Sequence, residues 1–442
     1  MSTAILSTLH EPVIKRLPTI EPAIFCMGLL IFIGFSLVGC ASQPLETRGF
    51  DTDIKTVSAR SPGGLSLICQ TSNGTCFNQY PMLNKSECQC AGAGGMVGGK
   101  AIINPVPGTL ADLSSVATVF FATDRNRTSE AGPESMFSAS RSDTISYGLA
   151  RVSIPATHQT GYLEAPSAFI RLRFLENAQK HVLLMQTKIM DKDAYFRAVQ
   201  DRVASSPKED AFIFIHGFNV SFENAARRTA QIAYDLGFRG APVFYSWPSR
   251  GSPTPLGYSA DSQTIEWSKE NLKRFLDDFL SKTKAKNVYL VAHSMGNRAL
   301  TAAFVALLNE KPTLRSRVKE MILAAPDIDA GIFKRDIAPA MVKLGEPITL
   351  YASSTDRALQ LAHIANGFPR AGDAGPGMVV VNGVETIDAT AINTSFLGHS
   401  SFAETREILN DWQYIIEQGL RASQRAGLMQ PSSTRPYWTF KK

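Results

Sequence analysis

The sequence predicts an α/β fold, in which helices cover both faces of a doubly wound, mostly parallel sheet. Two observations predict it: short, wholly apolar runs recur along the chain, and amphipathic helical stretches separate them. Strands of a parallel sheet are buried on both faces, so they lack the polar alternation of a half-exposed strand. With 442 residues, of which 44% are hydrophobic and 19% charged, the chain is long enough to build one large core.

The strand candidates are apolar runs bounded by turn residues, at positions 119–122, 149–154, 212–215, 243–245, 288–291, 321–323, 348–351 and 378–381. The helix candidates carry their apolar residues on one face, at about 222–236, 265–280 and 401–420. Ligands of doubly wound sheets bind beyond the carboxyl ends of the strands. Functional residues are therefore expected directly after strands.

An apolar run of seventeen residues, 23–39, ends against Cys40. It is short for a membrane-spanning helix, which needs about 20 residues, and suits a secretory signal better. Its end, Leu37-Val38-Gly39-Cys40, resembles the lipobox of bacterial lipoproteins, which implies a signal peptide over residues 1–39 and a lipid on the Cys40 thiol. No Asp follows Cys40 directly, so the resemblance favours the outer membrane.

The alternative is an uncleaved signal anchor, because the charges before the apolar run (Glu11, Lys15, Arg16 and Glu21) cancel. Both interpretations export the rest of the chain. We therefore expect a protein of the bacterial cell envelope that faces the periplasm and is attached to a membrane.

The cysteines agree with export. Four of them, Cys69, Cys76, Cys88 and Cys90, lie within 22 residues, and none follows Cys90. In an oxidising compartment they predict two disulfides with three possible pairings. Their spacing matches no common zinc pattern, so no metal is expected.

A glycine-rich stretch at 94–100, GGMVGGK, nearly spells a phosphate-binding loop. Ala101 stands where the magnesium-binding hydroxyl belongs, and no strand is expected before the glycines. We therefore expect a flexible linker here, within a tether and cysteine-rich segment that spans residues 40–115.

A nucleophile candidate follows the run at 288–291, in Ala292-His293-Ser294-Met295-Gly296. This is the G-x-S-x-G turn with Ala in the first small position, and a helix follows it. The turn strains the serine backbone, so the residues two before and two after it must be small. The alternative for Ser294 is an ordinary helix N-cap.

A serine nucleophile needs an imidazole base. His399 lies in the loop between the last strand candidate and the closing helix, where this kind of sheet delivers its base. The other histidines belong to the targeting segment, precede the sheet core, neighbour the nucleophile, or lie in another turn or on a helical stretch: His10, His158, His181, His293, His216 and His363.

The base needs an orienting carboxylate, and Asp356 follows the run at 348–351. The order Ser294, Asp356, His399 is the one expected of this fold. Asp327 and Asp329, after the preceding strand candidate, are the rivals. Asp327 has a plain alternative role as a helix cap or turn residue.

The developing oxyanion needs N–H donors that are already in place. The run at 212–215 leads into His216-Gly217-Phe218-Asn219, where Gly217 lets the backbone approach closely. The N–H groups of Phe218 and Met295 are the expected donors. Asn219 or His216 is expected to brace the loop.

At these motifs the chain resembles an uncharacterised α/β-hydrolase family of the esterase/lipase superfamily. The matching segments are VFFATDRNR (119–127), FIHGFNVSFENAARRTAQIAYDLGF (214–238), YSWPSRG (245–251), VAHSMGNRAL (291–300) and AAPDID (324–329). The resemblance covers roughly residues 116–419 and implies the α/β-hydrolase fold and a Ser-Asp-His triad. We expect a hydrolase domain over residues 116–426 and a C-terminal tail over 427–442. The resemblance also implies that Trp247 and Arg250 line or brace the cleft, the alternatives being core packing and a surface cation.

The sequence thus predicts a serine hydrolase that cleaves carboxylic esters or thioesters through an acyl-enzyme on Ser294, without a cofactor. The substrate is expected to be a small-molecule or lipid ester. The alternative is a membrane-tethered binding or envelope lipoprotein with a weakly active hydrolase-like domain, and amide cleavage also stays open. The net charge of +6 is mild and its cations are scattered, so no nucleic-acid partner is expected.

Overall fold

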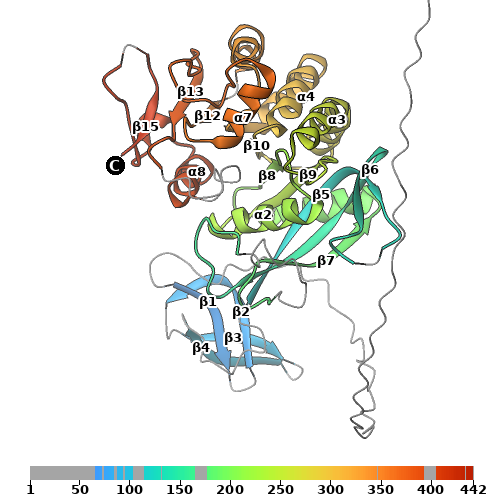
Figure 1. Cartoon of the computed structure of the whole chain (residues 1–442). Coiled ribbons are helices and arrows are strands. Elements are labelled where there is room, and N and C mark those ends of the chain that lie inside the picture. Colours follow the sequence, from blue (N-terminus) through green and yellow to red (C-terminus); the bar gives the residue numbers. More distant parts are fainter. Residues whose placement is uncertain are drawn as a thin grey trace, which may run out of the picture. The chain divides into compact units, whose positions relative to one another are not determined.

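The computed structural model describes residues 65–71, 74–83, 87–92, 95–102, 114–130, 132–164, 177–345, 347–392, 405–433 and 435–441. Two separate sheets lie within these ranges, one of four strands and one of eleven (Figure 1). Cys40 and His399 lie outside the described residues. No helix of the described residues is long and apolar enough to cross a membrane.

The small sheet is formed by the cysteine-rich segment. It contains β1 (Leu65–Thr71), β2 (Gly74–Leu83), β3 (Glu87–Gly92) and β4 (Gly95–Ile102), all antiparallel, in the order β2-β1-β4-β3. Cys69 is the register partner of Cys76 in the β1–β2 pair. Cys88 and Cys90 both belong to β3, opposite Gly99 and Val97.

The expectation of a flexible linker at 94–100 is wrong, because β4 occupies residues 95–102. Strand β4 pairs with β1 on one edge and with β3 on the other. Hydrogen bonds on both edges stabilise an extended conformation that an isolated glycine-rich chain would not keep. The stretch is therefore neither a linker nor the strand–loop–helix of a phosphate site.

The large sheet has the order β14-β15-β13-β12-β11-β10-β8-β9-β5-β6-β7. Its strands are β5 (Ser114–Arg127), β6 (Phe137–Pro155), β7 (Leu183–Met190), β8 (Asp210–Ile215), β9 (Ala241–Ser246), β10 (Asn287–His293), β11 (Val318–Ala324), β12 (Ile348–Ala352), β13 (Val384–Asp388), β14 (Leu428–Met429) and β15 (Trp438–Phe440). The pairs from β5 through β13 are parallel, whereas β6 and β7 extend one edge in antiparallel fashion. Strands β14 and β15, within residues 427–442, complete the other edge.

The expectation of a strand at 378–381 is wrong. Met378 and Val379 are buried, but the last strand of the parallel core is β13, which begins at Val384. A turn separates the two, with Gly383 at a φ of 87° and the Val384 N–H donating to the carbonyl of Val381. Apolar content alone does not distinguish a strand from an extended segment that packs on the core.

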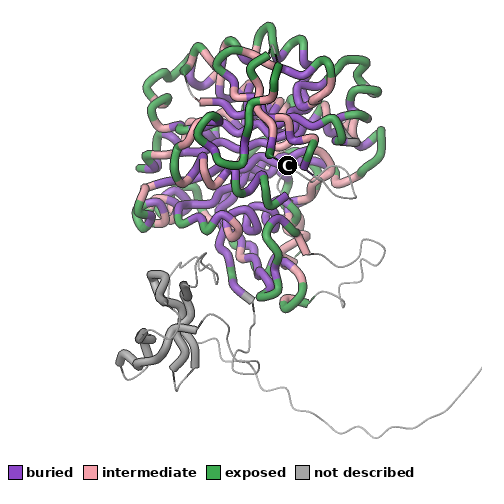
Figure 2. The backbone as a smooth tube through the Cα atoms, turned by 90° about the vertical axis from the view of Figure 1, so that its left-hand side faces the viewer, coloured by how far each residue is buried: buried purple, intermediate pink, exposed green. Residues whose placement is uncertain are grey.

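Helices cover both faces of the large sheet (Figures 1 and 2). They are α1 (Lys192–Ala204), α2 (Phe222–Asp235), α3 (Pro255–Lys282), α4 (Gly296–Glu310), α5 (Ala330–Ile332), α6 (Ala338–Leu344), α7 (Arg357–Asn366) and α8 (Arg406–Gln418), with the π-helix η3 (Phe333–Ile337) between α5 and α6. Helices α1, α3, α4 and α6 pack into the core on one face, and α2 and α8 into the core on the other. The structure is thus an α/β-hydrolase fold, as the sequence predicts.

One helix boundary matters for the site. Helix α3 begins at Pro255, ten residues before the start expected from its apolar face. The Thr254 side chain caps it by accepting from the Gly257 N–H at 3.0 Å. The additional turns carry Tyr258 and Asp261 to the carboxyl ends of the strands.

Candidate active site

Ser294 lies in the tight turn between β10 and α4. Its φ is +50°, a conformation that is unusual for a residue with a side chain, and it is buried. Its N–H donates to the carbonyl of Ala324 in β11 at 2.9 Å. Met295 occupies the cap position of α4, and no side chain caps that helix. Ser294 therefore forms the strained elbow that the motif predicts, and the N-cap interpretation is wrong.

The elbow requires small neighbours because helix and sheet meet closely there. A Cβ on Gly296 would lie 2.5 Å from the carbonyl oxygen of His216 and 2.7 Å from that of Ile215. A Cβ on Gly217 would lie 2.9 Å from the Cβ of Ser294. The loop that follows β8 is therefore in direct contact with the elbow.

This loop, residues 216–220, is the expected oxyanion loop. Asn219 adopts a positive φ of 60° within it, and Phe218 is half-buried. On the other side of Ser294, Met295 is buried at the N-terminus of α4, where backbone N–H groups have no partner within the helix. The residues expected to donate to an oxyanion thus flank the serine from β8 and from α4.

His216 braces the loop. Its Nδ1–H donates to the carbonyl of Gly217 at 2.9 Å, and its ring stacks on Trp247 with 5.2 Å between centroids. The Trp247 indole N–H donates to the carbonyl of His216 at 2.7 Å. Burial, assisted by the nearby charge of Arg125, lowers the pKa of His216 to about 3. His216 is therefore a neutral structural residue. Trp247 packs in the core and also braces the loop through its indole N–H. Arg250 is exposed.

Arg125 is a residue whose role sequence reasoning missed. It lies at the end of β5, is 2% exposed, and its guanidinium donates to three acceptors in two separate segments, the end of β9 with its following loop and the oxyanion loop. The acceptors are the Ser246 hydroxyl at 2.8 Å, the Ser249 carbonyl at 3.0 Å and the Val220 carbonyl at 2.8 Å. Burial lowers the pKa of Arg125 to about 10, which leaves it charged at neutral pH.

Asp261 of α3 completes this network. Its carboxylate accepts from the Ser249 hydroxyl at 2.6 Å and from the Arg250 N–H at 2.9 Å. Burial raises the pKa of Asp261, although these hydrogen bonds oppose the effect. Together with Arg125, it fixes the loop after β9 against the oxyanion loop.

Asp356 follows β12 and is buried at the start of α7. Its Oδ1 accepts from the Leu359 N–H at 3.0 Å, so the carboxylate caps the helix. Strands β10 and β12 are separated only by β11, so Asp356 and Ser294 share the same edge of the sheet. We call this edge, where the parallel strands end, the catalytic edge.

Asp327, the rival acid, is bound on both oxygens. Arg370 donates to its Oδ1 at 2.7 Å, and Arg298 and the Tyr258 hydroxyl donate to its Oδ2 at 2.9 and 2.8 Å. Burial acts to raise the pKa of Asp327, but the two guanidinium groups lower it below its usual value. Asp327 is therefore a structural anion. The other rival, Asp329, caps α5 through the Ile332 N–H at 2.9 Å.

Tyr258 connects these parts of the site. Its hydroxyl donates to Asp327 and accepts from Arg298 at 2.9 Å and from Asn366 of α7 at 3.0 Å. Its ring meets that of Phe218 edge-on, with 5.4 Å between centroids. The tyrosine thereby joins α3, α4, α7 and the oxyanion loop.

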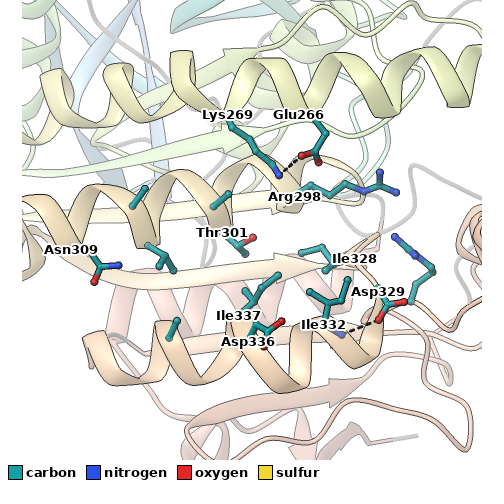
Figure 3. Close-up of a pocket in the computed structure, with 15 residues that line it drawn as sticks. Glu266, Lys269, Arg298, Thr301, Asn309, Ile328, Asp329, Ile332, Asp336 and Ile337 are labelled. Carbon is teal, nitrogen blue, oxygen red and sulfur yellow. Dashed lines mark hydrogen bonds and ion pairs between the residues drawn. The ribbon is translucent and has the colours of Figure 1, made fainter.

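An apolar groove of about 610 Å³ lies between α3, α4 and the α5–η3–α6 segment (Figure 3). Arg298 and Arg370, the two cations that bind Asp327, both line it. Its rim carries charges of both signs, including the ion pair of Lys269 with Glu266. A ligand in this groove would contact the ion pairs that support the elbow.

The chain belongs to a family described as "Alpha/beta hydrolase of unknown function (DUF900)", whose model matches residues 191–418. The matched region holds the elbow, the oxyanion loop and Asp356, whereas Arg125 precedes it. A comparison with curated proteins found no match.

Similar folds occur among solved structures at low identity. Lipase B of Aspergillus fumigatus is 14% identical, with a TM-score of 0.25 over 40% of this chain and 44% of the lipase, so less than half the lipase is spanned. A predicted CIB-like hydrolase of Thermoplasma acidophilum is 13% identical, with a TM-score of 0.28 over 53% of this chain and 90% of that one. Carboxylesterase CesB of Bacillus subtilis is 12% identical, with a TM-score of 0.26 over 52% and 100%. These similarities say nothing about the substrate.

Proposed function

We propose that the protein is a serine hydrolase that cleaves carboxylic esters or thioesters through an acyl-enzyme on Ser294. The single observation that carries the proposal is the backbone of Ser294, strained at a φ of +50° and pressed against the oxyanion loop. Strain of this kind persists only where the surrounding structure enforces it, and it presents the hydroxyl at the end of the strand. A binding module has no need of such a turn.

In the proposed reaction, His399 takes the proton of the Ser294 hydroxyl as its oxygen attacks the carbonyl carbon. The N–H groups of Phe218 and Met295 bind the negative oxygen of the tetrahedral intermediate. The same imidazole then protonates the leaving alcohol or thiol, and water releases the acid by the reverse sequence. The ester or thioester bond of the substrate breaks after the bond between Ser294 and the acyl group forms, and that second bond breaks after water adds. The proton passes through the imidazole in both halves of the reaction.

Two observations support Asp356 as the acid that orients His399. Asp327 has both of its oxygens bound by arginines and a tyrosine, so an imidazole would have to displace one of them. Asp356 is buried at the catalytic edge after β12, as the chain order predicts.

We also propose that the Cys40 lipid attaches the enzyme to the periplasmic side of a bacterial membrane.

A fluorophosphonate probe on the purified protein tests the proposal. Labelling of the wild type that is abolished in Ser294→Ala is the expected result, and an unlabelled wild type would support the binding alternative. Hydrolysis of p-nitrophenyl esters of increasing chain length would define the acyl preference, and an anilide of the same acyl group would test amide cleavage.

For the anchor, the expected results are globomycin-sensitive processing and loss of lipid labelling in Cys40→Ser. Unchanged electrophoretic mobility in both tests would support the signal anchor.

A further inference from the structure

Asn297 lies in the first turn of α4, three residues after Ser294, and is 0% exposed. Its amide nitrogen donates to the carbonyl of Ser294 at 2.9 Å and to the carbonyl of Ala324, at the end of β11, at 3.2 Å. A carbonyl oxygen only accepts, so the nitrogen of the amide and not its oxygen has to face both groups. One side chain of α4 therefore binds the nucleophile turn to the strand beside it.

These two bonds complete a set of contacts that holds the Ser294 backbone on both sides of its Cα. On one side, the Ser294 N–H donates to the carbonyl of Ala324 at 2.9 Å, the same carbonyl that Asn297 binds. On the other side, the Ser294 carbonyl accepts from the Asn297 side chain and from the Asp327 N–H at 3.2 Å. The orientations of these two peptide groups define φ and ψ of Ser294, so the contacts enforce its φ of +50°.

The oxygen of the same amide gains nothing from this arrangement. The Asn297 Oδ1 is buried and has no hydrogen-bond partner within the part of the chain that the structure describes. A buried acceptor without a donor lowers stability by at least as much as a typical hydrogen bond raises it. Asn297 therefore adds little net stability, and what its side chain does provide is the orientation of Ser294.

We propose that Asn297 is a positioning residue, which holds Ser294 in the strained conformation that presents its hydroxyl to the substrate. The effect on catalysis rests on the proposed function, whereas the strain on Ser294 can be measured without turnover. Asn297→Leu removes both donors together with the unpaired oxygen. The Ser294 carbonyl keeps the Asp327 N–H and the Ala324 carbonyl keeps the Ser294 N–H, so the fold is expected to persist. Asn297→Ala removes the same donors without adding volume, and it replaces the leucine variant if that variant does not fold.

The first test compares Asn297→Leu with the wild type in hydrolysis of a soluble p-nitrophenyl ester. A nucleophile displaced by about 1 Å costs about 100-fold in rate, so kcat should fall about 10- to 100-fold, with KM within about threefold of the wild type. The rate of fluorophosphonate labelling should fall by the same factor, and the urea midpoint should change little. Thr229→Val is the matched control, because it removes a buried hydrogen bond of α2, from the Thr229 hydroxyl to the Ala225 carbonyl at 2.7 Å, and should leave kcat unchanged. A kcat within about threefold of the wild type in folded Asn297→Leu, or an equal fall in the control, would overturn the proposal.

The second test measures the strain on residue 294 by urea unfolding. Alanine and glycine at this position differ by the Cβ that disfavours a positive φ. The difference between the urea midpoints of Ser294→Gly and Ser294→Ala therefore reports the strain, and the freedom of glycine in the unfolded chain adds equally with Asn297 and with Asn297→Leu. Asn297→Leu should shift this difference in favour of alanine; an equal difference in both backgrounds would overturn the proposal. A wild type that neither hydrolyses esters nor reacts with the probe, with the shift still present, would instead refute the proposed function.

Discussion

Replacing Gly217 by Ala places a methyl group between the oxyanion loop and the nucleophile. The new Cβ would lie 2.9 Å from the Cβ of Ser294 and 3.1 Å from the carbonyl oxygen of His293. Carbon atoms in contact prefer about 3.5–4.0 Å, so the loop has to retreat by roughly 0.6–1.1 Å. A displacement of about 1 Å at a reacting centre costs about 100-fold in rate, and loss of one oxyanion donor costs about 10²–10³-fold.

We therefore expect kcat for a soluble p-nitrophenyl ester to fall about 100-fold in Gly217→Ala, with KM nearly unchanged. Steady-state kinetics measure the effect, and a urea unfolding curve shows whether the fold persists. Gly427→Ala is the matched control, because its Cβ would meet no atom within 4 Å. A Gly217→Ala enzyme within about threefold of the wild-type kcat would show that the Phe218 N–H does not stabilise the transition state.

Three further outcomes are expected. Asp356→Asn should lower kcat/KM by about 10³–10⁴-fold and leave the urea midpoint unchanged. Asp327→Asn should instead lower the free energy of unfolding by about 3–5 kcal/mol, because it leaves two guanidinium groups without their anion. The opposite pattern would exchange the roles of the two aspartates. Burial disfavours the charged form of His158, but hydrogen bonds to Asp235 and Glu164 raise the pKa of His158 to about 9. The protonated His158 therefore stabilises the folded state fully below its unfolded pKa of about 6.5, and this stabilisation is lost as the pH rises to 9. The loss amounts to about 3 kcal/mol at most, and urea unfolding of His158→Gln should not show it. Non-reducing peptide mapping should link Cys69 to Cys76, since register partners lie about 4.5–5.5 Å apart between Cα atoms, within disulfide range; a link from Cys69 to Cys88 would contradict the register.

The sequence was sufficient for the strands of the parallel core from β5 to β12 and for the elbow, because both depend on local spacing, but it misplaced β13. A wholly apolar run followed by a small-x-Ser-x-Gly turn needs no knowledge of distant residues. Asp356 and the oxyanion loop were likewise located by their positions after strands, and the structure places both at the catalytic edge. Their roles in the reaction, and that of His399, stay predictions.

The Arg125 network could not be predicted from local pattern. Its acceptors lie 95 to 124 residues away in the chain, and their carbonyl groups carry no sequence signal. The start of α3 is different, since Thr254 followed by Pro255 is an N-cap with proline in the first turn. That signal was present, and the apolar periodicity concealed it because the first turns of the helix lie at the surface.

The contacts of Arg125 also determine how much of the chain is needed to form the catalytic edge. This arginine belongs to β5, before the family-matched region, yet it donates to the segments that form the catalytic edge. A fragment cut at residue 191 would keep every residue of the proposed triad and would leave the backbone carbonyls of Val220 and Ser249 without their donor. A fragment that keeps these contacts at the catalytic edge therefore has to include β5, because a boundary at the start of the family-matched region would remove Arg125.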